Sequence, residues 1–188
     1  MSVSPSSNSS TQPLPSRMQR QAFLETFGNC FRNGTTLAGR AFDKGTDAAA
    51  DTSHGLFEIL RAEFRAASDA EKFDVLKGYT PLDPRIEAAK IVADESQSAS
   101  LDAMTADQKG RLLELLGAYV EKFGFDAIFV VRNYTTAQLL AALEARMQTD
   151  RQTELAVTYG EVERLAEIQV SARFAGQASK DALKTAQA

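Results

Sequence analysis

The chain has 188 residues, of which 44% are hydrophobic, and a formal net charge of −4 with a pI of about 5.1. This length fits one domain whose core needs neither disulfides nor metals. An acidic chain without runs of like charge is a poor partner for nucleic acid, and no apolar run approaches the ~18 residues of a membrane span. The N-terminus lacks the basic-then-apolar order of a signal peptide, so we expect a cytoplasmic protein.

The chain contains one cysteine and one histidine, which limits the chemistry it can support. Cys30 cannot form an intramolecular disulfide, and its place on a predicted helix with Phe27 indicates a core residue. His54 follows Thr52, a residue type that caps helices, so we expect it at a helix start without a catalytic role. These two residues cannot build a metal site, and we predict none.

Residues 1–16 are mostly serine, proline and asparagine and are predicted to form a disordered tail. From Arg17 onward, apolar residues recur at helical spacing, which predicts a helical domain over 17–174 and a flexible C-terminal tail over 175–188. The predicted helices cover residues 18–31, 35–43, 53–66, 69–77, 84–100, 106–122, 136–148 and 151–174. The fold class is therefore all-α, a single-domain bundle of about eight helices.

Four capping-box patterns, in which Ser or Thr precedes Glu or Gln by three positions, mark predicted helix starts. They are Ser68 with Glu71, Thr105 with Gln108, Thr135 with Gln138, and Thr149 with Gln152. Gly78 is predicted to be a C-terminal cap, and Asp83 with Pro84 a further helix start.

Two stretches do not read as ordinary helix or linker. "LKGYTPLDPR", residues 76–85, holds a glycine, two prolines and a tyrosine, more turn signals than a plain connection needs, so we predict that it bends over a pocket. "FGFDAIFVVRN", residues 123–133, contains an apolar run at 127–131 that is either extended or a short buried helix.

Several segments resemble the family of decarboxylases that act on 2-oxo-4-hydroxy-4-carboxy-5-ureidoimidazoline (OHCU), the last step from urate to allantoin. They are "RQAFLETFGNCF" near the N-terminus and "ESQSASLDAMTADQKGRLLELLGAYVEKFGFDAIFVVRN" in the second half, and the resemblance extends over about residues 18–173. The positions in register are Glu95, Ala99, Leu101, Asp102, Thr105, Tyr119, Phe123, Gly124, Phe125 and Arg132. The resemblance implies an all-helical fold, a small-molecule substrate, a homodimer and no cofactor.

The polar motifs of that family are mostly replaced in this sequence. The family uses His-Pro-Asp-Leu for acid/base chemistry, and the matching "YTPL" has Tyr79 at the histidine position. The family's Ser-x-x-Glu-Gln reads "VADES", which retains Glu95 and substitutes Ser96 for glutamine. Gln169 stands where the family has an arginine. An ordinary tyrosine, with a pKa near ~10, exchanges protons at neutral pH less readily than histidine, near ~6.5.

The resemblance therefore predicts a pocket in which Tyr79 faces Glu95 and the backbone of the apolar run, with Arg132 at the edge. The catalytic candidates are Tyr79 and Glu95, and the substrate-binding candidates are Thr80, Ser96, Ala127, Ile128, Phe129, Val130, Val131 and Arg132. Enclosure should raise the pKa of Glu95 through desolvation unless Arg132 comes close enough to lower it.

Three hypotheses about function follow. The first is a divergent enzyme that uses this scaffold on another small carboxylated or ureido heterocycle. The second is a non-catalytic descendant that binds a ligand or a partner protein. The third is an authentic ureidoimidazoline decarboxylase whose histidine comes from elsewhere, for which only His54 is available.

Overall fold

The computed structural model describes residues 14–79 and 104–185, and within these ranges the chain forms helices and connecting segments without a strand. The α-helices are α1 (Arg20–Phe27), α2 (Thr35–Asp43), α3 (Ser53–Ala66), α4 (Asp69–Lys77), α6 (Ala106–Phe123), α7 (Thr136–Arg146) and α8 (Arg151–Thr185). Short 3₁₀ turns occupy Pro15–Arg17, Ala48–Asp51 and Val131–Asn133. The all-α prediction is confirmed, while the helix expected at 84–100 lies outside the described residues.

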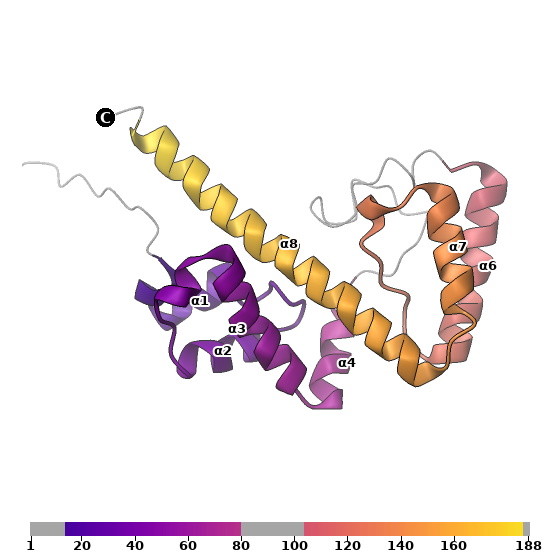
Figure 1. Ribbon diagram of the computed structural model, residues 1–188, viewed down its shortest axis with the longest axis horizontal. Helices are drawn as coiled ribbons and strands as arrows, with labels where there is room; N and C mark the ends of the chain where they lie inside the picture. Colours follow the sequence, from indigo (N-terminus) through magenta and orange to yellow (C-terminus); the bar gives the residue numbers. More distant parts are fainter. Residues whose placement is uncertain (1–13, 80–103, 186–188) are drawn as a thin grey trace, which may run out of the picture.

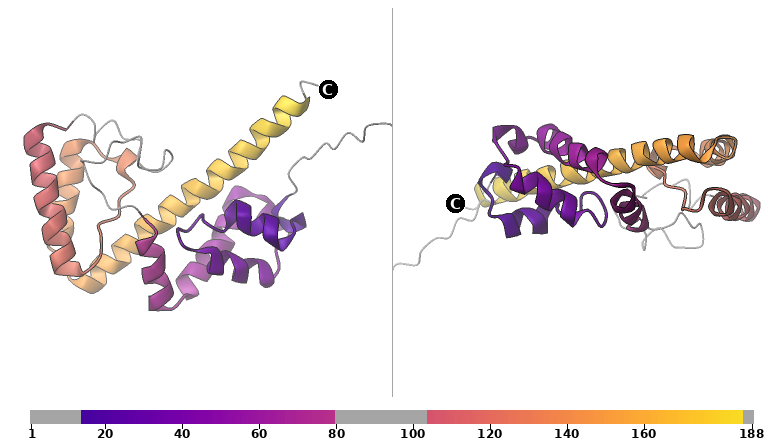
Figure 2. Two further views of the ribbon diagram at one scale, coloured as in Figure 1. Left: turned by 180° about the vertical axis from the view of Figure 1, so that it is seen from behind. Right: turned by 90° about the horizontal axis from the view of Figure 1, so that it is seen from below.

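The long helix α8 runs through the molecule, and two groups of helices lie along it (Figures 1 and 2). Helices α1, α2 and α3 gather along its C-terminal part, whereas α6 and α7 stand side by side near its N-terminal end (Figure 1). Aromatic pairs join α1 and α3 to α8: Phe27 of α1 packs against Phe174, and Phe64 of α3 packs against Tyr159. Helix α8 extends past Phe174, where the prediction ended it, to Thr185.

Three of the four predicted capping boxes are confirmed. Ser68, Thr105 and Thr135 each accept the backbone N–H three residues later, and the Glu or Gln at that position accepts the N–H of the cap residue. Two early backbone donors are satisfied at each helix start, which fixes where α4, α6 and α7 begin.

The fourth box, at the start of α8, is wrong. Thr149 instead donates its hydroxyl to the carbonyl of Arg146 at 2.8 Å, and the carboxylate of Asp150 accepts the N–H groups of Gln152 and Thr153 at 2.9 and 3.0 Å. A carboxylate directly before the helix accepts two amides and also complements the helix dipole, so it displaces a threonine hydroxyl one residue away. The backbone hydrogen bond from Thr153 lowers the pKa of Asp150.

Gly78 follows α4 as the predicted C-terminal cap, but it is right-handed, with φ of −75°. The reason for glycine is therefore space: an added Cβ would lie 2.6 Å from the Cβ of Arg32 and 3.0 Å from the Cγ of Asn33. Asn33 also donates its side-chain amide to the carbonyl of Asp74 at 3.0 Å. The end of α4 is thus pressed against the turn that follows α1.

The predictions for the two scarce residue types have different outcomes. Cys30 is buried, as expected of a core residue, and its burial raises the thiol pKa to about 11. Thr52 caps α3 by accepting the N–H of Gly55 at 3.0 Å, which places His54 in the first turn of that helix, where its side chain is exposed. That His54 has no catalytic role stays a prediction.

Candidate functional site

The described residues include only part of the predicted site. Tyr79 and residues 127–131 are described, whereas Thr80, Glu95 and Ser96 lie outside the described residues. The backbone of Arg132 belongs to the 3₁₀ turn Val131–Asn133. The predicted pairing of Glu95 with Arg132 and its effect on the pKa of Glu95 therefore stay predictions.

Tyr79 lies just beyond α4, and its side chain is buried, with 7% of its surface exposed. Helix α4 reaches the segment after α6 through Phe73, whose ring meets Phe125 edge to face with 6.3 Å between centroids. The guanidinium of Arg151, at the start of α8, lies over both rings. The end of α4, the segment after α6 and α8 thus form one neighbourhood (Figure 1).

The apolar run at 127–131 is irregular, neither helix nor strand, over 127–130 and enters the 3₁₀ turn at Val131, so the predicted alternative of a buried helix is wrong for 127–130. Gly124 ends α6 in the left-handed conformation, with φ of 77°, which turns the chain into the run. All five side chains of the run are buried. Phe129 packs edge to face on Tyr134, and the guanidinium of Arg146 lies 4.3 Å from the Phe129 ring centroid.

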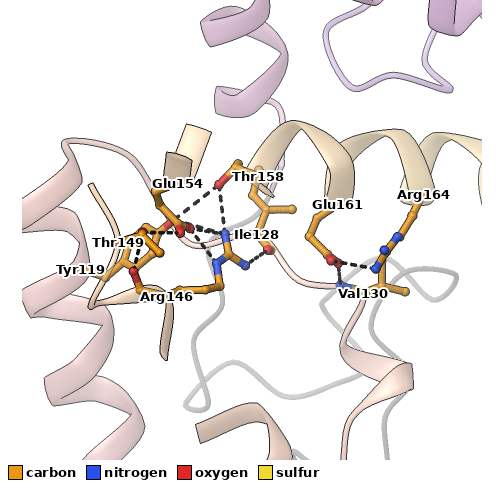
Figure 3. Close-up of polar contacts among 9 residues, drawn as sticks. All are labelled: Tyr119, Ile128, Val130, Arg146, Thr149, Glu154, Thr158, Glu161 and Arg164. Atoms are coloured by element: carbon orange, nitrogen blue, oxygen red, sulfur yellow. Dashed lines mark hydrogen bonds and ion pairs between the residues drawn. The ribbon is translucent and has the colours of Figure 1, made fainter. Parts of the chain in front are cut away.

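Arg146, at the end of α7, is the centre of a buried polar cluster beside this run (Figure 3). Its Nη1 donates to the carbonyl of Ile128 at 2.8 Å, and its Nε donates to Oε1 of Glu154 at 2.6 Å. Its Nη2 lies 3.0 Å from Oγ1 of Thr158 and 3.2 Å from the hydroxyl of Tyr119. One guanidinium therefore ties α6, α7 and α8 to the backbone of the run.

Glu154 is fully buried, and its charge is met by several donors. Besides Arg146, the hydroxyl of Tyr119 donates to Oε1 at 2.5 Å and that of Thr149 to Oε2 at 3.2 Å. Burial, and then the hydrogen bond to Glu154, raise the pKa of Tyr119, so its phenol remains a donor at neutral pH. A buried carboxylate with this many partners is satisfied rather than reactive.

Glu161, two turns along α8 from Glu154, holds the run at a second point (Figure 3). Its Oε2 accepts the backbone N–H of Val130 at 2.9 Å, while Oε1 pairs with Nη1 of Arg164 at 3.1 Å. Sequence reasoning missed both Arg146 and Glu161 because each reads as an ordinary charge on a helix. Only the packing of α7 and α8 around the run reveals their partners.

These two contacts fix the direction in which Phe129 presents its own peptide groups. The described peptide bonds are trans, so the C=O and N–H within each unit point in opposite directions. The Ile128 carbonyl points to Arg146, which turns the Phe129 N–H away from it, and the Val130 N–H points to Glu161, which turns the Phe129 C=O away. Neither Phe129 group has a hydrogen-bond partner in the described part of the chain.

Gln169 provides a second unpaired donor on the buried face of α8, with 3% of its surface exposed. Its Oε1 accepts Nη1 of Arg173 at 2.7 Å, and Arg173 is itself fixed by donating to the carbonyl of Thr26 at 2.7 Å. This contact orients the amide, and its Nε2 has no partner among residues 14–79 and 104–185. The group is a neutral donor that a ligand carbonyl could satisfy.

Among residues 14–79 and 104–185, no group of three or more His, Cys, Asp or Glu side chains could hold a metal ion. None of the helices described is long and apolar enough to cross a membrane.

Comparison with known families gives one match that covers most of the chain. The profile of the family described as OHCU decarboxylase matches residues 16–171. A 2-oxo-4-hydroxy-4-carboxy-5-ureidoimidazoline decarboxylase of Haloferax volcanii is 26% identical over 164 residues, 86% of this chain and 94% of that protein. A uric acid degradation bifunctional protein of Bacillus sp. is 24% identical over 79% of this chain. That protein is longer, and the match covers only 29% of it.

Solved structures show the same fold. An (S)-allantoin synthase aligns with a TM-score of 0.68 and 20% identity over 85% of this chain, and this chain spans 52% of that protein. An OHCU decarboxylase crystallised in the presence of (S)-allantoin aligns with a TM-score of 0.64 and 19% identity over 78% of this chain and 96% of that one. At these identities the similarity establishes the fold alone.

Proposed function

Because the chain belongs to the OHCU decarboxylase family, we propose that it is a divergent, cofactor-free enzyme acting on a small carboxylated or ureido heterocycle, and not on the ureidoimidazoline itself. The observation that carries this proposal is the Phe129 peptide pair, which offers one donor and one acceptor beside buried apolar walls. A ureido or lactam edge, with adjacent C=O and N–H, is its chemical complement.

The proposed reaction is a decarboxylation. The bond between the carboxylate and its carbon breaks, CO₂ leaves, and the electron pair left on the carbon takes up a proton. Tyr79 is our candidate proton donor, because it stands at the position of the family's histidine and its buried phenol hydroxyl can donate a proton. Glu95 is the candidate carboxylate of the same site.

Two features support a substrate other than the ureidoimidazoline. Tyr79 stands where the resemblance places the family's histidine, and Gln169 stands where it places an arginine. A neutral amide donor suits a ligand carbonyl, whereas an arginine suits a carboxylate with a full charge. The substitutions favour a substrate with one fewer negative group at that position.

The authentic decarboxylase is the weaker candidate, because it requires His54 as the acid/base. Ser53, next to His54, bonds Ser171 of α8 at 2.9 Å, whereas the apolar run is held by Glu161 of the same helix. Ten residues of helix place these two points about 15 Å apart. His54 is also exposed, which suits a surface position. The non-catalytic binder remains the main alternative to an enzyme.

Release of CO₂ from the ureidoimidazoline, measured beside the Haloferax volcanii relative, tests this proposal. We expect a rate at least about 100-fold below that of the relative, since losing a positioned acid/base typically costs 10²- to 10⁴-fold. Equal rates would establish the authentic decarboxylase instead. A panel of carboxylated ureides then separates an enzyme, which releases CO₂ from one of them and loses this with Tyr79→Phe, from a binder, which releases none.

We also propose that the protein is a homodimer, as the family resemblance implies, and that it works in the cytoplasm.

A further inference from the structure

We infer that Arg146 and Glu161 are positioning residues, which orient the two peptide units around Phe129 so that its N–H and C=O face the ligand. This inference rests on the proposed function, because it assigns the two charges a role toward the ligand of the same site. Neither residue touches the ligand in this account. Each acts through the backbone that it holds.

Each of the two contacts holds one of two adjacent peptide units (Figure 3). Arg146 holds the unit between Ile128 and Phe129 by its carbonyl, and Glu161 holds the unit between Phe129 and Val130 by its N–H. In the described part of the chain no strand pairs with this irregular segment, so no ladder of hydrogen bonds fixes these units there, and each could rotate about its flanking bonds. Two anchors, one for each unit, remove that freedom.

Both anchors are themselves held in place. Arg146 and Glu161 are 8% and 6% exposed, and hydrogen bonds from charged groups in such surroundings are shorter and stronger than those between neutral groups. The guanidinium of Arg146 is fixed further by Glu154 and Thr158, and the carboxylate of Glu161 by Arg164. The segment is therefore held against α7 and α8 by these two contacts, while the N–H and C=O of Phe129 have no partner among residues 14–79 and 104–185.

Glu161 is the better residue to change, because removing Arg146 would leave the buried carboxylate of Glu154 without its charged partner. Glu161→Leu removes the acceptor for the Val130 N–H, whereas Glu161→Gln retains an acceptor oxygen in a side chain of the same shape. Glu163→Gln is the matched control, since Glu163 lies on the same helix, is only partly buried, and pairs with Arg65 of α3 rather than with the run. The probe is (S)-allantoin, a ureido heterocycle, with the ureidoimidazoline as a second probe.

Two readouts are needed, and both are taken well below the unfolding temperature of each variant. Amide hydrogen exchange reports whether Val130 is released, and calorimetry reports the Kd for the probe. In Glu161→Leu we expect faster exchange at Val130 and at least a tenfold weaker Kd. Glu161→Gln should fall between this variant and the wild type, and Glu163→Gln should match the wild type in both.

The outcomes separate this inference from the proposed function. A Glu161→Leu protein that releases the Val130 amide yet binds the probe as the wild type does would overturn the positioning role alone. Unchanged exchange at Val130 would do the same, because the contact would then not hold the peptide. A wild-type protein that binds neither probe nor any member of the panel of carboxylated ureides would refute the proposed function, and the positioning role with it.

Discussion

Arg146 and Glu154 form a buried ion pair, and a buried ion pair is sensitive to replacement of one partner alone. Replacing Arg146 with methionine leaves a buried carboxylate with only hydroxyl donors. Breaking such a pair from one side typically costs about 3–5 kcal/mol. We expect a loss of this size in the free energy of unfolding of Arg146→Met, measured by urea denaturation.

The matched control for that variant is Arg111→Met, which breaks an exposed pair with Glu144. Exposed pairs contribute ~0–1 kcal/mol, so the control should stay close to the wild type. Replacing both members of the buried pair, as Arg146→Met with Glu154→Leu, should recover part of the loss, because the unpaired charge is gone. Equal losses in Arg146→Met and Arg111→Met would contradict the buried-pair account.

Glu71 gives the chain a predicted dependence on pH. The hydrogen bond from Arg40, followed by those from Ser68, lowers the pKa of Glu71 from 4.5 to about 2. A carboxylate whose pKa is lower in the folded state stabilises it fully above its unfolded value and loses this effect as pH falls toward the folded value. The stabilisation by Glu71 should therefore be complete above about pH 4.5 and disappear toward pH 2.

Urea denaturation of the wild type and Glu71→Gln between pH 7 and pH 2 checks this dependence. The wild type should be the more stable protein at neutral pH, and the two curves should converge as pH falls. Glutamine retains an acceptor for the capping box at Ser68, so the comparison isolates the charge. A gap that stays constant down to pH 2 would show that the pKa of Glu71 is not shifted by folding.

At the scale of elements, the sequence predicted local structure well at most helix starts, where a residue and its partner are near each other along the chain. The capping boxes at Ser68, Thr105 and Thr135 are of this kind, because the cap and its partner are three residues apart. The start of α8 was missed because two adjacent residues, Thr149 and Asp150, can both cap, and the sequence pattern does not weigh a carboxylate against a hydroxyl.

The candidate site was predicted less completely, because the residues that determine it are far apart along the chain. A buried apolar run at 127–131 could be recognised from its composition, but not the direction of its peptide groups. That direction depends on Arg146 and Glu161, which are 18 and 31 residues from their backbone partners. Charges on helix surfaces are usually solvated, so a sequence alone gives no reason to select these two.

Gly78, at the end of α4, packs against the turn after α1, and its substitution tests how closely these two segments are packed. Its φ of −75° suits any residue, so alanine carries no conformational penalty there. The added Cβ would nevertheless collide with Arg32 and Asn33, and such overpacking typically costs about 1–3 kcal/mol. We expect Gly78→Ala to lower the unfolding temperature.

Gly117, exposed in the interior of α6, is the matched control for this substitution. A Cβ there meets nothing within 4 Å, and alanine is favoured over glycine in a helix by about 0.5–1 kcal/mol. Gly117→Ala should therefore raise the unfolding temperature while Gly78→Ala lowers it. Thermal unfolding followed by circular dichroism would contradict the packing argument if both variants shifted in the same direction.

At the scale of the whole molecule, α8 makes one cooperative unit of two groups of helices. Phe64 and Tyr159 join α3 to α8, and the Arg146 cluster joins α6 and α7 to the same helix. The buried stripe of α8 is apolar at Val162, Ala166 and Val170. Because the buried apolar residues of both groups form one core cluster in the described part of the chain, we expect a single unfolding transition.

The surface of the molecule bears on its proposed assembly as a homodimer. Val120 on α6 and Val157 on α8 are 42% and 39% exposed, and they are the large apolar side chains most open to solvent on these helices in the described part of the chain. Burying them against a second copy would remove apolar area from water. Light scattering at micromolar concentration should give a mass of about twice 20.4 kDa.

If the dimer forms through this surface, Val157→Lys should shift the mass toward 20.4 kDa, because a lysine ammonium cannot be buried there without a partner. Gln152→Lys, at an exposed position on the same helix, is the control and should leave the mass unchanged. A wild-type mass of 20.4 kDa would refute the dimer itself, whereas a dimer that survives Val157→Lys would place its interface on another face. Because α8 carries both Val157 and the anchor Glu161, a dimer that covers Val157 would also hold the helix that orients the candidate site.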